Sequence, residues 1–220
     1  MRGVITAFWD IDGTLVESPK GRADLFSEAV AALGVQPIEP EGPREGFTDR
    51  KLAEVHLAAS GQPQTRVEEY LTALDRLSEE FYGHTPRDPV PGAREALQLT
   101  RRAGWRNGLL TGNSPLRART KLSTSGFDLD AIDWECFASG AYVSDRAELG
   151  RRARALAGGG PLVVLGDTAL DAVAAEAADA AFVAVNTDPV VLATIADRAV
   201  LAVCSLAAPE FIDFVQTHRG

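Results

Sequence analysis

The sequence feature that most constrains the fold is a set of short β-branched or apolar runs separated by longer helical patterns. Such runs, bounded by turn residues, are typical of strands buried in a sheet. The expected strands are Val4–Trp9, Gly108–Leu110, Glu135–Ala138, Leu162–Leu165, Ala181–Val185 and Ala199–Val203. The expected helices are Gly92–Ala103, Pro115–Ser125, Asp145–Ala157, Ala169–Ala178, Pro189–Ala196 and Ala207–Gln216. Strands that alternate with helices predict an α/β fold with a parallel sheet and helices on both faces.

One long interval interrupts this alternation. Between residues 16 and 89 the sequence shows no convincing strand, and apolar side chains recur instead at the spacing of one helix face. They are Phe26, Val30 and Leu33 in one stretch, and Val67, Leu71, Leu74 and Phe81 in another. Prolines bracket these patterns. We therefore expect a small all-helical unit of residues 16–89, inserted after the first strand of an α/β core of residues 1–15 and 90–220.

Polar residues follow the first, second and fourth of the expected strands. In a parallel sheet the carboxyl ends of the strands lie along one edge, and ligands bind there. The polar residues are Asp10, Asp12, Gly13, Thr14, Thr111, Gly112, Asn113, Asp167 and Asp171. Four of them are carboxylates, and like charges gathered at one place raise each other's pKa or need a cation. Since no His or Cys accompanies them, we expect a hard divalent ion with oxygen ligands, with Mg²⁺ as the default.

The same edge carries groups that can hold a phosphate. The turns at residues 13–14 and 111–113 offer backbone N–H groups and hydroxyls that can surround an anion. Lys121 lies about two turns into the helix that follows the second turn, and no other Lys occurs between residues 52 and 220. Carboxylates, a divalent cation, hydrogen-bond donors and one Lys are together the groups that phosphoryl transfer uses.

Four segments resemble, in order and spacing, the four motifs of the haloacid dehalogenase-like (HAD) hydrolase superfamily. They are Asp10–Leu15, Leu110–Asn113, Lys121 and Gly166–Asp171. The resemblance extends over nearly the whole chain, and within the superfamily the chain resembles the phosphoglycolate phosphatase-like branch. It implies a Rossmann-like core with a helical cap after the first strand. It also implies Mg²⁺-dependent hydrolysis of a phosphomonoester, with a small phosphorylated metabolite such as 2-phosphoglycolate as the substrate, through an aspartyl-phosphate.

The resemblance implies catalytic roles for four residues. Asp10 is then the nucleophile that attacks phosphorus, and Asp12 is the acid that protonates the leaving alcohol and later the base for water. Thr111 hydrogen-bonds the phosphoryl group, with the two following amides nearby. Lys121 neutralises Asp10 and the developing charge. Because the dehalogenase branch lacks an acid at the position of Asp12, phosphate chemistry is favoured over cleavage of a carbon–halogen bond.

The resemblance also implies the metal ligands. Asp10 and the backbone carbonyl of Asp12 then bind Mg²⁺ together with the carboxylate of Asp167, and Asp171 orients the ligands around the metal. A structural alternative exists for Asp171, because the first turn of a helix favours Asp through the helix dipole.

A Gly-containing turn in the helical unit is the candidate for substrate selection. Gly46, Thr48 and Asp49 match a Gly-x-Thr-Asp-like turn that related phosphatases carry where the cap faces the active site. Thr48 or Asp49 is expected to cap the helix that follows. Arg44 and Arg50 are then placed to bind an anionic substrate, and the alternative is a capped surface helix with solvated charges.

Charge and composition exclude several classes of partner. The chain has 22 Lys and Arg residues against 31 Asp and Glu residues, a formal net charge of −9. Phosphate backbones and anionic membrane surfaces are held by cationic side chains, so we expect neither nucleic acid nor a membrane as a partner. No apolar run approaches the roughly 18 residues that a membrane span needs, and we expect no secretory signal. We expect a cytoplasmic monomer or homodimer.

The Cys and His residues show no spacing typical of a metal or redox site. Cys136 and Cys204 are expected to be inert thiols buried in the core, as in a protein of a reducing compartment. His56, His84 and His218 share no spacing with one another or with the Asp residues, and we expect them to be solvated.

Two alternatives to a phosphatase remain open from the sequence. A phosphomutase of the β-phosphoglucomutase kind uses the same aspartyl-phosphate and returns the phosphoryl group to a sugar. A non-catalytic module that binds phosphate or metal is the second alternative, and the pair of Asp10 and Asp12 argues against it, because a binder needs no acid or base.

Overall fold

The described part of the chain builds a parallel sheet. A computed structural model describes residues 3–18 and 24–218. They form a six-stranded sheet with the order β3-β2-β1-β4-β5-β6, in which all neighbours are parallel. The strands are β1 (Thr6–Trp9), β2 (Arg106–Thr111), β3 (Phe137–Ser139), β4 (Leu162–Gly166), β5 (Ala181–Val185) and β6 (Leu201–Val203). Each overlaps a strand expected from the sequence, so the predicted α/β fold is confirmed.

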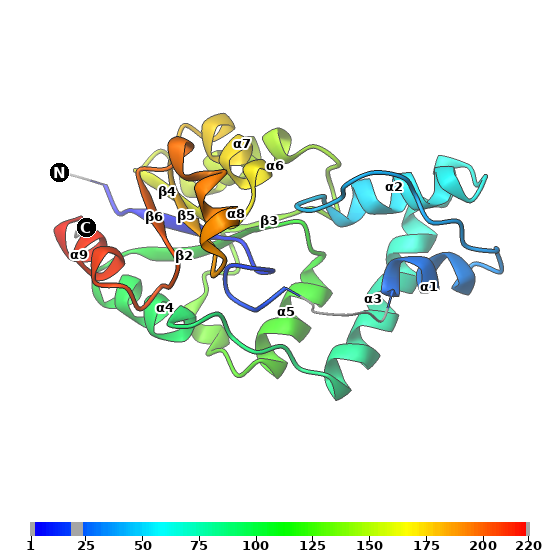
Figure 1. Cartoon of the computed structure of the whole chain (residues 1–220), viewed down its shortest axis with the longest axis horizontal. Coiled ribbons are helices and arrows are strands. Elements are labelled where there is room, and N and C mark those ends of the chain that lie inside the picture. Colours follow the sequence, from blue (N-terminus) through cyan, green and yellow to red (C-terminus); the bar gives the residue numbers. More distant parts are fainter. Residues whose placement is uncertain (1–2, 19–23, 219–220) are drawn as a thin grey trace.

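Helices cover both faces of this sheet (Figure 1). Successive side chains of a strand point to opposite faces, and in β1 Phe8 and Trp9 accordingly belong to two different buried clusters. The cluster of Trp9 is covered by α4 (Ala93–Arg102), α5 (Pro115–Thr124) and α9 (Pro209–Thr217). The cluster of Phe8 is covered by α6 (Arg146–Ala157), α7 (Ala169–Ala177) and α8 (Pro189–Ala193). This Rossmann-like arrangement buries the strands on both sides, as their apolar sequences require.

Three of the helices between β1 and β2 lie beyond one end of the sheet and have a core of their own (Figure 1). They are α1 (Leu25–Ala32), α2 (Asp49–Ala59) and α3 (Val67–His84). Their buried cluster includes Leu57, Tyr70 and Leu74, which are at most 1% exposed. The helical spacing read from the sequence therefore predicted an all-helical insertion correctly. We call these three helices, together with the loops that join them, the cap.

The chain enters and leaves the cap side by side. Val16 forms an antiparallel bridge with Pro89, and the N–H of Glu17 donates to the carbonyl of Asp88 at 2.8 Å. The N–H of Val90 donates to the carbonyl of Leu15 at 2.9 Å. We therefore propose that the two units divide close to residues 15–16 and 89–90, as expected from the sequence. Residues 19–23 of the first connection lie outside the described residues.

The expected helices are present with shifted ends. The helix predicted as Pro189–Ala196 ends at Ala193, because the hydroxyl of Thr194 donates to the carbonyl of Val191 at 2.7 Å and competes with the helical pattern. Three short 3₁₀-helices complete the described elements: η1 (Gln64–Arg66), η2 (Leu129–Ala131) and η3 (Ala196–Arg198). None of the described helices combines the length and the apolar character needed to cross a membrane.

Two expectations about single side chains are wrong. His56 is buried inside the cap, where its ring stacks between Phe26 and Tyr70 with centroid distances of 5.8 and 6.3 Å. The sequence predicted a solvated residue because His56 shares no spacing with the other His residues or with the Asp residues. Cys136 is buried as expected, whereas Cys204 directly follows the edge strand β6 and is exposed.

Candidate active site

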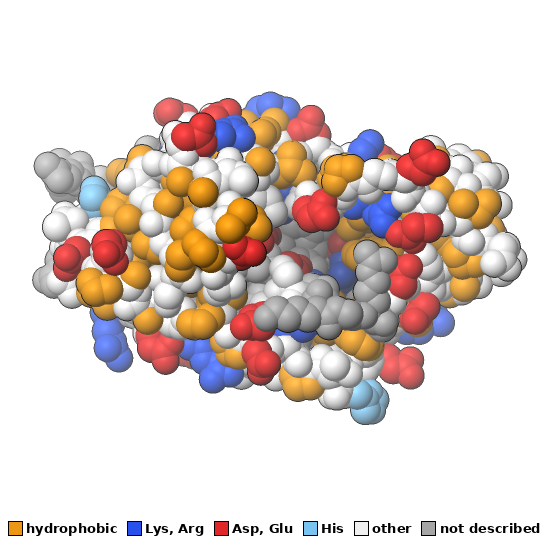
Figure 2. All heavy atoms as spheres, in the orientation of Figure 1, with side chains coloured by type: hydrophobic (Ala, Val, Ile, Leu, Met, Phe, Trp, Pro, Cys, Tyr) orange, Lys and Arg blue, Asp and Glu red, His pale blue; other side chains and the backbone are white. Residues whose placement is uncertain are grey.

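The carboxyl ends of three neighbouring strands bring the predicted polar residues together. Strand β1 lies between β2 and β4, so the segments that follow these strands meet at one edge of the sheet. They line a cavity of about 1050 Å³ between the core and the cap. Figure 2 shows the surface hollowed between the two units. The cavity is lined by most of the residues singled out in the sequence: Asp10, Asp12, Arg44, Thr111, Gly112, Asn113, Lys121 and Asp167.

Asp10 is a buried carboxyl group directly after β1. Only 4% of the residue is exposed, and its N–H donates to the carbonyl of Leu165 at 2.9 Å. Burial, followed by the nearby carboxylate of Asp171, raises the pKa of Asp10 to about 7, and the opposing effects of Arg146 and Thr111 are smaller. Raised pKa values of this kind mark a carboxyl group whose charge lacks full compensation within the protein.

Three carboxylates converge on one point. Asp10, Asp167 and Asp171 each offer an oxygen atom, and these atoms lie within 4.8 Å of one another. Gly13 makes room for Asp167, because a Cβ atom at position 13 would overlap the Asp167 carboxylate, and the φ of +84° there also favours glycine. Asp171 is held by α7, where it forms a capping box with Thr168.

These carboxylates fit a hard divalent cation. Burial and the neighbouring charge of Asp171 raise the pKa of Asp167 well above its ordinary value. Within residues 3–18 and 24–218, neither Asp167 Oδ1 nor Asp171 Oδ1 has a hydrogen-bond partner. Unsatisfied, closely spaced carboxylate oxygens in a buried site are the donor set that Mg²⁺ prefers. The side chain of Asp12 points to other partners, which leaves its backbone carbonyl for the metal, as the family resemblance implies.

Asp12 forms a closed hydrogen-bonded group with Lys121 and Asn113. Lys121 Nζ lies 2.7 and 2.6 Å from the two Asp12 carboxylate oxygens and donates to Asn113 Oδ1 at 2.7 Å. Asn113 Nδ2 donates to Asp12 Oδ2 and to Thr111 Oγ1, both at 2.8 Å. Although burial acts in the opposite direction, the Lys121 ammonium lowers the pKa of Asp12 to about 2. From the sequence we expected this ammonium to neutralise the charge of Asp10, whereas in the structure it pairs with Asp12.

Among the described residues Arg146 forms an ion pair with Asp10, and the sequence did not single it out. Its guanidinium lies 3.8 Å from Asp10 Oδ1 and 3.3 Å from Asp171 Oδ1, and Nε donates to the carbonyl of Gly46 at 2.7 Å. Only 4% of the side chain is exposed. One signal was available: Arg146 is the first residue of α6, and a cation at a helix N-terminus opposes the helix dipole. Such a residue needs an anionic partner elsewhere.

The turn at residues 111–113, which we call the phosphate turn, joins β2 to α5. Ser114 caps α5 by accepting from the N–H of Arg117 at 3.2 Å, and Pro115 takes the first helical position. The positive end of the α5 dipole therefore faces the cavity and favours an anion there. Thr111 is fully buried, as is Thr14, whose hydroxyl has no hydrogen-bond partner within the described chain.

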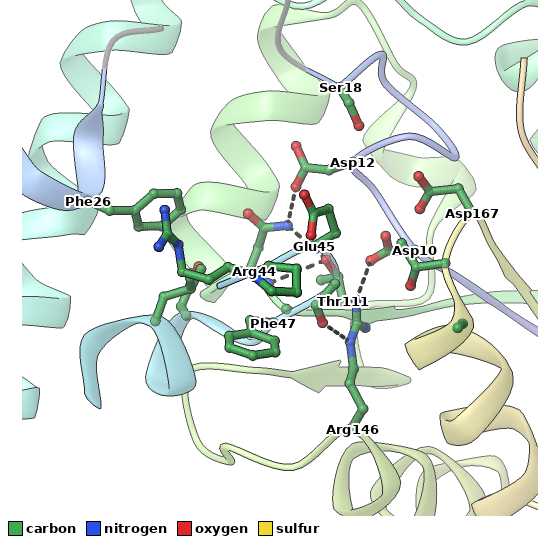
Figure 3. A pocket seen from close by; sticks show the side chains of 18 of the residues that line it. Asp10, Asp12, Ser18, Phe26, Arg44, Glu45, Phe47, Thr111, Arg146 and Asp167 are labelled. Atoms are coloured by element: carbon green, nitrogen blue, oxygen red, sulfur yellow. Dashed lines mark hydrogen bonds and ion pairs between the residues drawn. The ribbon is translucent and has the colours of Figure 1, made fainter. Parts of the chain in front are cut away.

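The candidate substrate residues of the cap separate into two groups. Arg44 lines the cavity (Figure 3), and its guanidinium also pairs with Glu39. Arg50 does not line the cavity, because its guanidinium binds the carbonyl of Ala141 at 2.9 Å and the carboxylate of Glu68. Thr48 is fully buried and caps α2 by accepting from the N–H of Lys51 at 3.1 Å.

The raised pKa values predict how stability depends on pH. In the folded chain Asp10 keeps its proton up to about pH 7, and the unfolded chain loses it near 3.8. In chelator we therefore expect the free energy of unfolding to fall as the pH rises through this interval, by about 1.4 kcal/mol per pH unit for one carboxyl group. Mg²⁺ should flatten the slope, because a bound cation stabilises the ionised carboxylates. Urea unfolding at pH 5, 6 and 7, with EDTA or with Mg²⁺, measures how the free energy of unfolding changes with pH. Equal slopes in both conditions would contradict a cation site here.

Comparisons with known proteins identify the family of this chain. A family model described as haloacid dehalogenase-like hydrolase matches residues 6–179. A search among curated proteins found no match.

Solved structures share the fold at low identity. A mutant of CbbY from Rhodobacter sphaeroides, in complex with xylulose-(1,5)bisphosphate, is 18% identical with a TM-score of 0.67, covering 84% of this chain and 87% of that one. β-Phosphoglucomutase from Clostridium difficile is 15% identical with a TM-score of 0.69, covering 98% of both chains. A putative phosphoglycolate phosphatase from Lactobacillus plantarum is 16% identical with a TM-score of 0.54, covering 81% of this chain and 84% of that one.

The family match spans most of the chain, from the first strand to the end of α7. It includes the acidic groups after β1 and β4 and the phosphate turn after β2. The chain therefore belongs to the haloacid dehalogenase-like hydrolases.

Proposed function

We propose that this chain is a Mg²⁺-dependent phosphomonoester hydrolase that works through an aspartyl-phosphate. The observation that carries the proposal is a pair of carboxyl groups at one cavity with opposite environments. Asp10 lies at the candidate cation site with its pKa raised to about 7, and Asp12 is paired with Lys121 with its pKa lowered to about 2. A divalent cation bound beside Asp10 would favour its ionised form, which is the form that a nucleophile needs, while Asp12 is held apart from that site by Lys121.

In the proposed first step, an Asp10 oxygen attacks phosphorus and the bond from phosphorus to the substrate oxygen breaks. Asp12 gives a proton to that leaving oxygen, so the product leaves as an alcohol. Lys121 lowers the pKa of Asp12, and a dianionic phosphate beside Asp12 acts in the opposite direction. When the phosphate is bound, the pKa of Asp12 therefore rises, and Asp12 can carry the proton. In the second step, water attacks phosphorus, Asp12 takes its proton, and the bond from phosphorus to Asp10 breaks to release inorganic phosphate.

The other residues of the site hold these groups in place. Asn113 ties Asp12 to Thr111, so the acid and the phosphate turn share one set of hydrogen bonds. Arg146 holds the nucleophile, and the N-terminus of α5 faces the transferred group. Asp10, Asp167 and Asp171, with the carbonyl of Asp12, would hold Mg²⁺, which supplies positive charge next to the phosphoryl oxygens.

The cavity suggests a substrate larger than 2-phosphoglycolate. Its volume of about 1050 Å³ lies at the upper end for small-molecule sites and far exceeds a two-carbon acid. The cap contributes the cation Arg44 and the aromatic rings of Phe26, Phe47 and Tyr82 to the lining, together with acidic residues such as Glu45. We therefore propose a phosphorylated metabolite of sugar size, a choice that the sugar bisphosphate bound to the similar CbbY also supports.

Phosphate release from a substrate panel tests the proposal. The panel contains an aryl phosphate, 2-phosphoglycolate, sugar monophosphates and bisphosphates, and nucleotides, each with Mg²⁺ or with EDTA. We expect release that requires Mg²⁺ and is fastest with a sugar phosphate. Accumulation of an isomeric sugar phosphate instead of inorganic phosphate would identify a phosphomutase. If ligands bind without any turnover, a binding module replaces the enzyme.

A further inference from the structure

Asp49, the first residue of α2, joins the cap to Gly112 in the phosphate turn and to Ser114, which directly follows the turn. Its N–H donates to the carbonyl of Gly112 at 2.7 Å, and its Oδ2 accepts from the N–H of Ser114 at 2.7 Å. Its other carboxylate oxygen binds the guanidinium of Arg117 on α5. The two side chains are 4% and 3% exposed, so this ion pair is buried. One cap residue thus holds the residues on either side of Asn113.

The cap backbone also packs tightly against the phosphate turn. A Cβ atom at Gly112 would lie 2.6 Å from the carbonyl oxygen of Phe47 and 3.2 Å from the Cα atom of Thr48. No larger side chain fits there without separating the two units. The backbone of the cap is therefore in direct contact with the phosphate turn.

Helix α3 of the cap binds the first turn of α5 from another side. Arg117 Nε donates to Ser78 Oγ at 3.0 Å, and Ser114 Oγ donates to Asp75. The Asp49–Arg117 pair is therefore surrounded by hydrogen bonds from both units. Buried ion pairs of this kind add little net stability, but removal of one partner is costly because the other charge stays buried. Such a pair is suited to define one geometry.

We propose that Asp49 is a positioning residue that couples the seating of the cap to the geometry of the phosphate turn. Through Gly112 and Ser114 it determines where Asn113 lies, and Asn113 in turn holds Asp12 and Thr111. Both carboxylate oxygens of Asp49 bind the core, so its action on a phosphate is indirect. This inference rests on the proposed function, since it deepens the role of the same site.

The test compares Asp49→Ala and Asp49→Asn with a matched cap variant, Glu54→Ala. Glu54 also lies on α2 and also contacts the core, through Ser144 Oγ, but it does not touch the phosphate turn. We measure the affinity for inorganic phosphate by calorimetry with Mg²⁺, thermal unfolding, and the amide resonances of residues 112–114 in the ligand-free chain. Asparagine keeps an acceptor for Ser114 and loses the charge that pairs with Arg117, so it provides the milder change.

We expect Asp49→Ala to weaken phosphate binding at least tenfold and to shift the three amide resonances. Asp49→Asn should lie between it and the unchanged chain, and Glu54→Ala should alter only the melting temperature. For a substrate that is turned over, kcat should fall more than KM rises, because the turn contacts the phosphoryl group. Unmoved resonances in Asp49→Asn, or an equal loss of affinity in Glu54→Ala, would overturn the inference. If the chain does not hydrolyse or bind phosphate, the proposed function fails, and the resonances still decide the role of Asp49.

Discussion

Replacing Asp10 by Asn is expected to abolish phosphate release while the chain stays folded. The amide has nearly the same shape as the carboxylate, but its oxygen does not form the bond to phosphorus that starts the reaction. We expect a loss on the order of 10⁴-fold or more, as for removal of other nucleophiles. In chelator at pH 8 the variant should also be more stable, because burial and Asp171 disfavour the ionised form of Asp10. The raised pKa makes Asp10 destabilising from near pH 4 upward, with the full effect above about 7.

Phosphate release at high protein concentration and chemical unfolding measure the two effects. Asp213→Asn on the exposed surface of α9 is the matched control, and it should change neither quantity. A residual rate within tenfold of the unchanged chain would assign the nucleophile to another group. Lower stability at pH 8 in chelator would mean that the Asp10 charge is compensated better than the structure indicates.

The second large effect is expected for Arg146→Ala. This change removes the guanidinium that lies between Asp10 and Asp171 and also removes a hydrogen bond to the cap at Gly46. Loss of one partner from a buried ionic group costs about 3–5 kcal/mol, because the remaining charges stay buried. We expect this loss in chelator and a smaller one with Mg²⁺, since the cation neutralises the same carboxylates. Activity should fall about 10²-fold or more, as for removal of a preorganised charged donor.

A lysine at this position keeps the charge but lacks the planar guanidinium that contacts Asp10, Asp171 and the carbonyl of Gly46. Compared with Arg146→Ala, we therefore expect Arg146→Lys to restore stability more fully than activity. Arg151→Ala is the matched control, because Arg151 lies on the same helix with a side chain that is 57% exposed. Unfolding in EDTA and in Mg²⁺, together with phosphate release, provides the measurements. If Arg146→Ala and Arg151→Ala behave alike, Arg146 does not hold the nucleophile.

The parallel sheet and the convergence of the acidic groups could be predicted from the sequence. β5 runs from Ala181 to Val185 as expected, because a buried strand in a parallel sheet consists of consecutive apolar residues. The position of Asp10 and Asp167 at one edge follows from parallel strands, whose carboxyl ends must lie together. Local capping was equally readable, since Thr48 precedes its helix with a hydroxyl suited to the free N–H groups.

The partners of the charged side chains could not be predicted. Lys121 was expected to pair with Asp10 and instead pairs with Asp12. Arg146 was not singled out from the sequence, although it forms an ion pair with Asp10. Both outcomes depend on the rotation of α5 and α6 about their axes, which is determined by packing against the sheet. No short-range pattern records that rotation. His56 is a similar case, because its burial depends on Phe26 and Tyr70 from two other helices.

The sequence by itself thus determined the order of strands and helices, the inserted cap and the set of residues at the active edge. These follow from periodicity and from chain direction, which are local properties. Only the tertiary structure decided which cation faces which carboxylate and that Asp49 joins the cap to the phosphate turn. The reason is that these interactions act over a few ångströms in space between residues that are far apart in the sequence. Asp10 and Arg146, for example, are separated by 136 positions. They are established only when the helices pack.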